Sequence, residues 1–311
     1  MPNAALHFVL ARRVLSVWEA RPIAAPFELS ESSRNAFFHG AIGPDMGYFP
    51  GAAQILSQLA HHARTGELCR ALVEEARGPV QAAFAWGWVT HVLADVAVHP
   101  LVNRACGERL TGTRTPVWGD EVGTLHMRVE IGLDAVYRAR HPDAAAVRLA
   151  PALSAEDARF VVRAYRRTFG AAPEPAGVMD AHRRVTRLSA LLALVLRLSA
   201  AALCGRGRLS RLAAWLPLGA LAALCPRGSH GRALFTPLAP APWLVAEVDE
   251  VVDEFPDWFL AHFGSGLQFL RDHCLDTGEA ATQTTPRAHA AIAAIRAAAA
   301  GRTFHPRPAL A

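Results

Sequence analysis

The sequence contains no lysine, so arginine alone supplies the basic side chains behind the formal net charge of +5. Without lysine the chain cannot carry the phosphate-cradling motif Gly-x-x-x-x-Gly-Lys, and the motif Gly-x-Ser-x-Gly is missing as well. The many arginines and alanines are typical of GC-rich codon usage. We favour that explanation over selection for guanidinium–phosphate contacts.

Cysteines are few, odd in number and without Cys-x-x-Cys spacing. This pattern argues against a disulfide framework and against a thiolate zinc site, and it is typical of reduced, small apolar residues in a cytosolic protein. The five are Cys69, Cys106, Cys204, Cys225 and Cys274.

Long apolar runs are also scarce. Residues 188–203 are interrupted by Arg197, and residues 212–224 are broken by Pro217 and Gly219. A membrane-spanning helix needs about 20 apolar residues. We therefore predict that 188–224 forms a hairpin in the protein core. An interfacial or re-entrant membrane hairpin is the first alternative, and true membrane spans are the least favoured.

The distribution of charged residues indicates where in the cell the protein would act. Between residues 180 and 232 Asp180 is the only carboxylate among many arginines, so this part of the chain could meet an anionic membrane or nucleic acid. The N-terminus has Arg12 and Arg13 after its first apolar residues and lacks a signal-peptide pattern. We expect a cytoplasmic protein with peripheral membrane contact through 188–224, and the sequence indicates no specific protein partner.

The fold class predicted from the sequence is all-α. Alanine and leucine dominate, alternating strand patterns are missing, and Gly and Pro separate long helical patterns. We expect a metal-binding helical domain at 1–175, a helical extension at 176–300 that packs on it and includes the Arg-rich hairpin, and a loose tail at 301–311.

The spacing of apolar residues predicts a series of helices, with N-caps at Asn3 and Ser154 and a break at Gly66. The segment before residue 37 is expected to be a loop, residues 37–51 an irregular turn, and 107–119 a further loop. Trp258, Phe259 and Phe263 are core candidates, together with Phe269. The expected helices cover about 3–20, 52–62, 67–76, 79–98, a stretch around 126–134 that ends near 141, 154–170, one or two helices in 243–273, and a peripheral helix at 279–300.

The most informative stretch is 91–100, His-Val-Leu-Ala-Asp-Val-Ala-Val-His-Pro. On a helix, His91, Asp95 and His99 fall within about 80° of one another, so one face carries imidazole, carboxylate and imidazole. Such a face suits zinc, and apolar flanks would make an unpaired carboxylate costly. Pro100 is expected to end the helix at His99 and to let His99 face a different ion.

Further polar residues could complete the site. His126 and Glu130 again stand four residues apart, and Asp134 follows one turn later. Asp45 is the only carboxylate in the turn at 37–51. Taken alone, His7 is most simply a core histidine, one of His61 and His62 can face inward, and His39 is interpreted as structural.

The ordered set of His7, Gly43-Pro44-Asp45, His61 before Thr65-Gly66, His91-x-x-x-Asp95-x-x-x-His99-Pro100 and His126-x-x-x-Glu130 resembles the zinc-dependent phospholipase C family. More closely it resembles the bacterial branch of phospholipase C/D domain proteins, and fungal zinc nucleases for single-stranded nucleic acid share the fold. The resemblance covers the first 140 residues.

The resemblance implies a cluster of two or three zinc ions that hydrolyses phosphodiesters. A first ion would be held by His61, His91 and Asp95, with Asp45. We choose His61 over His62 because its spacing to Thr65-Gly66 fits the family.

By the same resemblance, His99, His126 and Glu130 would hold a second ion, and His7 a third, bridged to the first by Asp95. In secreted members an N-terminal tryptophan binds the third zinc, whereas His7 here follows Met1-Pro2 closely, so sites with two and with three ions both stay open.

These ligands favour hydrolysis by metal-activated water, with Asp45 as ligand and base. The predicted function is that of a metal-dependent hydrolase of phosphoric diesters, with phospholipid as a candidate substrate. The alternatives are a nuclease-like phosphodiesterase and a metal-stabilised helical protein that binds lipid or a partner without turnover. A di-iron oxidase is least favoured because paired Glu-x-x-His motifs are missing.

Overall fold

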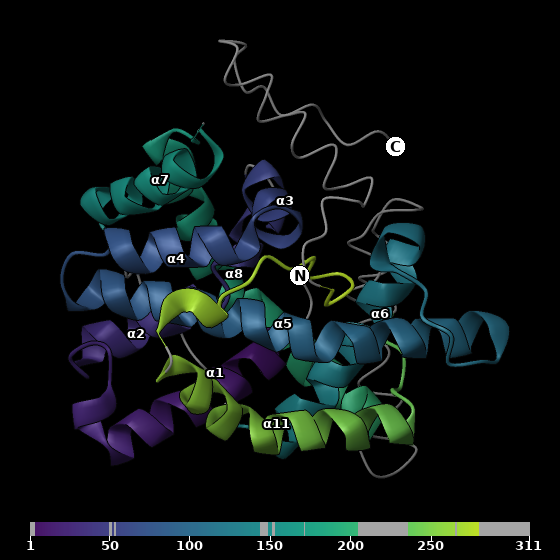
Figure 1. Ribbon diagram of the computed structural model, residues 1–311. Coiled ribbons are helices and arrows are strands. Elements are labelled where there is room, and N and C mark those ends of the chain that lie inside the picture. The colour runs from purple at the N-terminus through teal and green to yellow at the C-terminus, as the bar shows by residue number, and fades with distance from the viewer. Residues whose placement is uncertain are drawn as a thin grey trace.

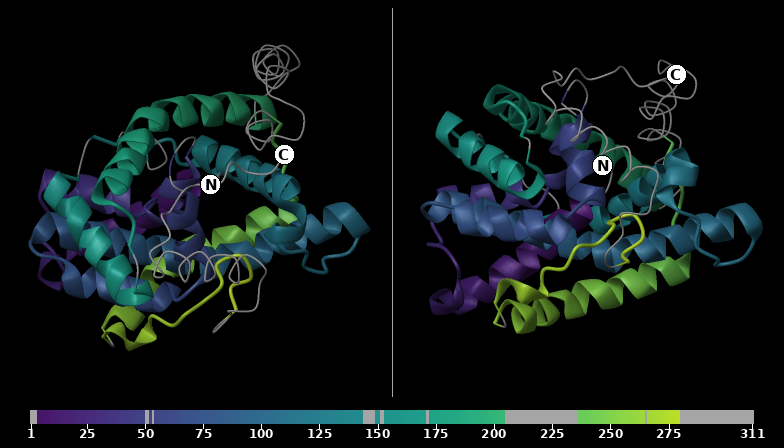
Figure 2. Two further views of the ribbon diagram at one scale, coloured as in Figure 1. Left: turned by 90° about the horizontal axis from the view of Figure 1, so that it is seen from above. Right: turned by 45° about the horizontal axis from the view of Figure 1, so that its top comes forward.

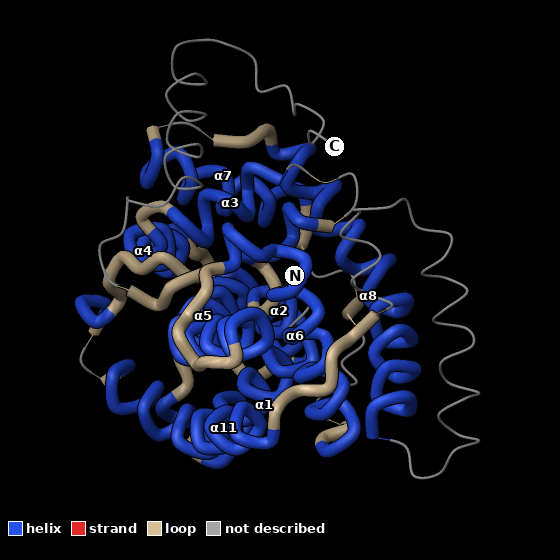
Figure 3. The backbone as a smooth tube through the Cα atoms, turned by 90° about the vertical axis from the view of Figure 1, so that its right-hand side faces the viewer, coloured by secondary structure: helices blue, strands red, loops and turns tan. Residues whose placement is uncertain are grey.

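The computed structural model describes residues 4–49, 52, 54–143, 149–150, 153–170, 172–204, 236–264 and 266–279. In these ranges the chain forms helices joined by short loops and contains no strand, as Figure 3 shows. The all-α prediction is confirmed. The predicted apolar run 212–224, most of the alanine-rich segment 279–300, the tail 301–311 and Asn3 lie outside the described residues.

The longest helix among the described residues, α5 (Pro79–Thr111), crosses the middle of the molecule. Helices α4 (Thr65–Glu75) and α11 (Pro242–Phe263) lie on opposite sides of it in Figure 1. It packs most closely on α2 (Glu31–Gly40), where Gly40 and Gly87 face each other. A Cβ atom at Gly87 would lie 2.0 Å from the carbonyl oxygen of Phe37. Only glycine permits this approach, which brings the end of α2 against the middle of α5.

Pro100 does not end α5, contrary to the prediction, and the helix continues to Thr111, so that the first part of the predicted loop at 107–119 is helical and residues 112–118 remain a loop. A proline inside a helix removes one backbone hydrogen bond. Here Gly278 of a distant segment lies against Pro100, because a Cβ on Gly278 would be 2.8 Å from the proline ring. We attribute the continuation of the helix to packing, since both flanks are largely buried.

Two helices cover one side of α5: α1 (Ala4–Ala20) and α11 (Pro242–Phe263). Trp18 of α1 is fully buried and contacts Phe259 and Phe263 of α11 edge to face, with ring centroids 5.8 Å apart in each pair. The core prediction is confirmed for Phe259, whereas Trp258 is 39% exposed and was assigned wrongly. Its ring lies against those of Phe255 and His262.

The remaining elements surround this centre, and α8 runs along α6 and α7 in both views of Figure 2. They are η1 (Pro22–Ala24), η2 (Pro44–Tyr48), α3 (Gln54–His62), α4 (Thr65–Glu75), α6 (Gly119–Arg140), α7 (Ala155–Phe169), α8 (Pro175–Cys204) and η3 (Leu267–Phe269). The run 188–203 forms the last part of α8. No helix among the described residues is long and apolar enough to cross a membrane.

Local signals predicted some helix ends and missed others. Ser154 begins α7 with a capping box, as its residue type predicts. The segment expected to be a loop contains α2, which begins after the N-cap Ser30. The break before α4 falls at Arg64, which has a left-handed backbone (φ 47°), and Gly66 lies inside α4. Gly66 is needed for close packing instead, because a Cβ there would lie 2.4 Å from backbone atoms of Arg271.

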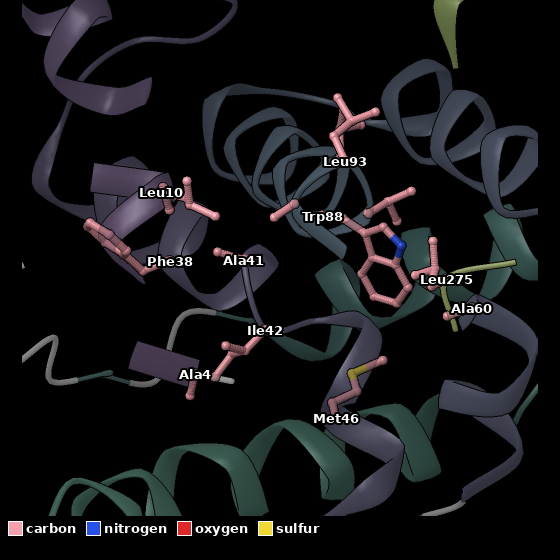
Figure 4. Packing of buried hydrophobic residues seen from close by; sticks show 14 of the residues in the cluster. Ala4, Leu10, Phe38, Ala41, Ile42, Met46, Ala60, Trp88, Leu93 and Leu275 are labelled. Atoms are coloured by element: carbon pink, nitrogen blue, oxygen red, sulfur yellow. The ribbon is translucent and has the colours of Figure 1, made fainter. Parts of the chain in front are cut away.

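The apolar core extends to the region where these elements meet. Figure 4 shows Trp88 of α5 with Leu275 and Ala60 on one side, and Ile42 and Met46 nearby. All five are buried. Residues far apart in the sequence therefore form one apolar environment beside the polar cluster described next.

Candidate metal centre

The candidate centre is built on one face of α5. Asp95 lies between His91 and His99, with its Oδ2 atom 3.2 Å from His91 Nε2 and its Oδ1 atom 3.5 Å from His99 Nε2. The side chains are buried, at 1% exposure for Asp95. Residues eight apart on a helix are separated by about 12 Å. The two imidazoles therefore belong to opposite ends of the cluster, and the carboxylate contacts both.

Helix α1 contributes His7, whose Nε2 atom lies 3.2 Å from Asp95 Oδ1. Its ring stacks on that of His91 with centroids 3.9 Å apart. The start of α1 is held by Asp134, whose two carboxylate oxygens accept hydrogen bonds from the backbone N–H groups of Ala5 and Leu6 at 3.1 and 3.0 Å. Asp134 is thus a capping residue for α1 and does not extend the ligand face of α6.

Asp45 and His61 approach from η2 and from the end of α3. Asp45 Oδ1 lies 3.3 Å from His61 Nε2, and the same nitrogen lies 3.7 Å from Asp95 Oδ2. Its neighbour His62 points elsewhere, toward Asp276, at 4.0 Å. The structure therefore brings His61, and not His62, into the cluster.

Helix α6 supplies the side chains at the other end of the cluster, next to His99. Glu130 Oε1 lies 3.2 Å from His126 Nε2, one turn away on the same helix, and 3.1 Å from His99 Nε2 on α5. All eight residues proposed as ligands are thus gathered in one buried cluster. Three groups within it have ligand atoms within 4.8 Å of one another: His7, His91 and Asp95; Asp45, His61 and His91; and His99, His126 and Glu130.

The distances suit zinc. Two ligand atoms about 2.0–2.1 Å from a tetrahedral zinc ion lie about 3.4 Å apart. The nitrogen–oxygen distances in the cluster run from 3.1 Å for His99 to Glu130 up to 3.7 Å for His61 to Asp95. His91 Nε2 and Asp95 Oδ1 are buried and lack a hydrogen-bond partner among the described residues. Buried atoms of this kind, facing one another, fit a shared cation.

Most of the imidazoles are oriented through their second nitrogen, as zinc ligands usually are. His61 Nδ1 donates to the carbonyl oxygen of Ser57 at 2.7 Å, and His91 Nδ1 to that of Ala41 at 2.9 Å. His99 Nδ1 donates to the carbonyl oxygen of Leu275 at 2.6 Å. In the neutral imidazole the proton therefore sits on Nδ1, and Nε2, which is directed into the cluster, is the nitrogen available to a metal ion.

The electrostatic field of the cluster is strong. Burial alone would lower the pKa of His99, but Asp95 and Glu130 outweigh it and raise the pKa to about 10. Burial opposes ionisation of Asp95, yet His99 and His91 hold its pKa well below the usual value. His7 differs, because burial and His91 lower its pKa. The carboxylates are therefore ionised and demand positive charge, which protons or metal ions can supply.

Three parts of this arrangement were not predicted: Asn103, the capping role of Asp134, and residues 270–279. Residues 270–279 cross α5 as the yellow loop in Figure 1. Their contacts with His99 and Asn103 are made by backbone carbonyls, which carry no sequence signature, so residue type alone could not have revealed them. His39, interpreted as structural, donates from its Nε2 atom to the carbonyl oxygen of Ala150 at 2.6 Å.

A family model described as zinc dependent phospholipase C matches residues 6–172. The matched region exceeds half of the chain and reaches through α7, further than the 140 residues on which the resemblance rested. No curated protein and no solved structure matches.

Proposed function

The chain belongs to the zinc dependent phospholipase C family, and from this premise we propose that it is a zinc-dependent hydrolase of phosphoric diesters. The observation that carries the proposal is Asp95, a buried carboxylate within 3.7 Å of the Nε2 atoms of four imidazoles. Such an arrangement supports bridging of two ions. A site that served only to stabilise the fold would need one closed coordination shell.

We assign the ligands as the sequence suggested. Asp45, His61, His91 and Asp95 would hold the first ion. The second would be held by His99, His126 and Glu130. His7, joined to the first set through Asp95, would hold a third. Bound zinc lowers the pKa of a coordinated water toward about 7 and stabilises negative charge on a phosphoryl oxygen.

Asp45 is our choice for the group that takes the proton of the attacking water. Burial disfavours its charge, but His61 and His91 help to hold its pKa below the usual value, so its carboxylate is ionised at neutral pH, the state that both a metal ligand and a base require. It stands on η2, at the edge of the cluster. His61 orients it through a 3.3 Å contact.

As substrate we propose phospholipid. The support is the basic stretch 180–232, whose arginines would attract an anionic membrane surface. Residues 205–232 of this stretch lie outside the described part of the chain. Peripheral contact through 188–224 is part of this proposal. A nuclease-like phosphodiesterase would instead need aromatic side chains that stack on bases beside the cluster.

The test combines metal analysis with hydrolysis. We expect the purified protein to contain two or three zinc ions per chain, by elemental analysis, and to hydrolyse phosphatidylcholine in mixed micelles. Chelation should abolish turnover and added zinc should restore it. Single-stranded oligonucleotide is assayed in parallel.

Each result has a distinct meaning. Cleavage of the oligonucleotide without cleavage of lipid would replace the phospholipid substrate by nucleic acid. A full complement of zinc without turnover of either substrate would indicate a metal-stabilised protein that binds without catalysis. A protein that takes up no metal would end the proposal.

A further inference from the structure

The C-terminal segment, residues 270–279, lies beyond the region matched by the family model and yet contacts both ends of the candidate metal centre. The backbone N–H of Leu275 donates to the carbonyl oxygen of His61 at 2.8 Å. The carbonyl oxygen of the same residue accepts from His99 Nδ1 at 2.6 Å. The backbone of one residue, Leu275, thus links a residue of the first ligand set to a residue of the second.

Asn103 makes the next contact with this segment. It stands on α5 one turn beyond His99 and is completely buried. Its side-chain nitrogen donates to the carbonyl oxygen of Asp276, and its Oδ1 atom accepts from His126 Nδ1 at 3.1 Å. Because a carbonyl oxygen can only accept, the amide orientation is determined. His126 therefore carries its proton on Nδ1 and presents Nε2 to Glu130 and His99.

We propose that Asn103 is a positioning residue for the second ion, and that its side chain joins His126 to residues 270–279. The proposal rests on the metal-dependent function argued above. An amide suits this place because it donates in one direction and accepts in the other. Residues 270–279 supply no ligand of the second ion. They nevertheless orient two of the three ligands of that ion, His99 directly and His126 through Asn103.

The same geometry predicts how substitutions differ. In Asn103→Asp the carboxylate still accepts from His126, but it now meets the Asp276 carbonyl with oxygen against oxygen. In Asn103→Leu neither bond can form. Asn103→Asp therefore loses the hydrogen bond to the segment and keeps the one to His126, whereas Asn103→Leu loses both.

Zinc uptake is the first measurement, made by titration against a competing chelator. In Asn103→Leu we expect the affinity for one ion to fall about 10–100-fold, as for other residues that orient ligands, while the remaining ions bind as in the wild type. Asn103→Asp should retain the wild-type stoichiometry. Equal binding by Asn103→Leu and the wild type, or equal loss in both variants, would overturn the proposal.

Amide hydrogen exchange of residues 272–278 in the metal-free protein is the second measurement. Both variants should exchange faster there than the wild type, with α7 unchanged. Unaltered exchange in Asn103→Asp would show that the side chain does not hold the segment and would overturn the proposal even if Asn103→Leu fails to fold. Because no metal is needed, the result stays distinct from a failure of the proposed hydrolase function.

Gln81 offers a matched control on the same helix. Its amide also bridges two partners: Oε1 accepts from the Arg77 backbone N–H at 2.9 Å, and Nε2 donates to Asp157 at 2.8 Å. It lies near the start of α5, away from the cluster. Gln81→Leu should lose stability without changing zinc affinity or exchange at residues 272–278. If it changes either as much as Asn103→Leu does, the effect of Asn103→Leu is a general one and the proposal fails.

Discussion

At the scale of single residues, Asp95 has the most contacts in the cluster. Oδ1 lies near His7 and His99, and Oδ2 near His91 and His61. Because a carboxylate offers two oxygens, Asp95 contacts imidazoles from three helices at once. The buried charge is tolerable only if cations or protonated imidazoles offset it.

We predict that Asp95→Asn loses at least one zinc ion and all diester hydrolysis while the helices persist. The amide replaces one of the two oxygens by an NH₂ group, which cannot bind a metal and would face an unprotonated imidazole nitrogen. Elemental analysis, activity and circular dichroism measure the three parts. Asp180→Asn is the control, because Asp180 pairs only with Arg184 on the surface of α8 among its contacts described here. Full metal content and full turnover in Asp95→Asn would remove Asp95 from the proposed bridge.

At the scale of elements, the crossing of α2 and α5 sets the position of the first ligand set. The carbonyl oxygen of Ala41, just past the end of α2, accepts the Nδ1 proton of His91. The glycine pair Gly40 and Gly87 brings the two helices close enough for this bond. The orientation of the His91 imidazole therefore depends on a backbone contact between the two helices.

Gly87→Ala should separate the two helices, because its methyl group would lie 2.0 Å from the Phe37 carbonyl oxygen. We expect a loss of about 1–3 kcal/mol in the free energy of unfolding, as for other overpacked sites, and weaker binding of zinc. Gly177→Ala in α8 is the matched control, since nothing lies within 4 Å of its added Cβ. Denaturant titration and zinc competition measure both variants. A Gly87→Ala protein as stable as the control would contradict the role of this crossing.

At the scale of the whole molecule, the centre is assembled from five helices or turns and one extended segment. His7 comes from α1, Asp45 from η2, His61 from α3, and the others from α5 and α6, while residues 270–279 add backbone contacts. Helices on both sides of the predicted boundary at 175/176 pack together, as Trp18 and Phe259 show. The division into 1–175 and 176–300 stays a prediction.

A second buried histidine pair makes the stability of the fold sensitive to acid. His39 and His182 lie with ring centroids 4.3 Å apart. Burial lowers the pKa of His39 to about 4, and burial together with His39 lowers that of His182 to about 3. The unfolded chain binds protons at these residues below about pH 6.5, whereas the folded chain does not until pH 4 or lower. Stability from this pair is complete above pH 6.5 and falls as the pH drops toward 4.

We therefore expect the metal-free wild type to lose stability between pH 6.5 and 4 more steeply than His39→Gln, by up to about 1.4 kcal/mol per pH unit, because the variant lacks one of the two histidines. Glutamine retains a donor for the Ala150 carbonyl oxygen. Urea titrations across this range measure the slopes. Above pH 7 the difference between the two proteins should not depend on pH, and parallel curves below pH 6.5 would refute the assignment.

Sequence alone determined the fold class and the identity of the clustered residues. Helical spacing placed His91, Asp95 and His99 on one face, because residues four apart on a helix lie one turn apart. Order along the chain then pointed to His7, Asp45, His61, His126 and Glu130, and the family match supports that reading. The capping of α7 by Ser154 was equally local and equally predictable.

Tertiary structure decided what spacing cannot encode. It carried α5 through Pro100, and it directed His61 into the cluster and the equally buried His62 toward Asp276. It also placed Asp134 as the cap of α1 and exposed Trp258. It also brought residues 270–279 to His99 and Asn103, which stand more than 170 positions earlier in the chain. The physical reason is the same in each case: these outcomes depend on backbone carbonyls, glycine contacts and the burial of neighbours, which come together only when distant segments pack.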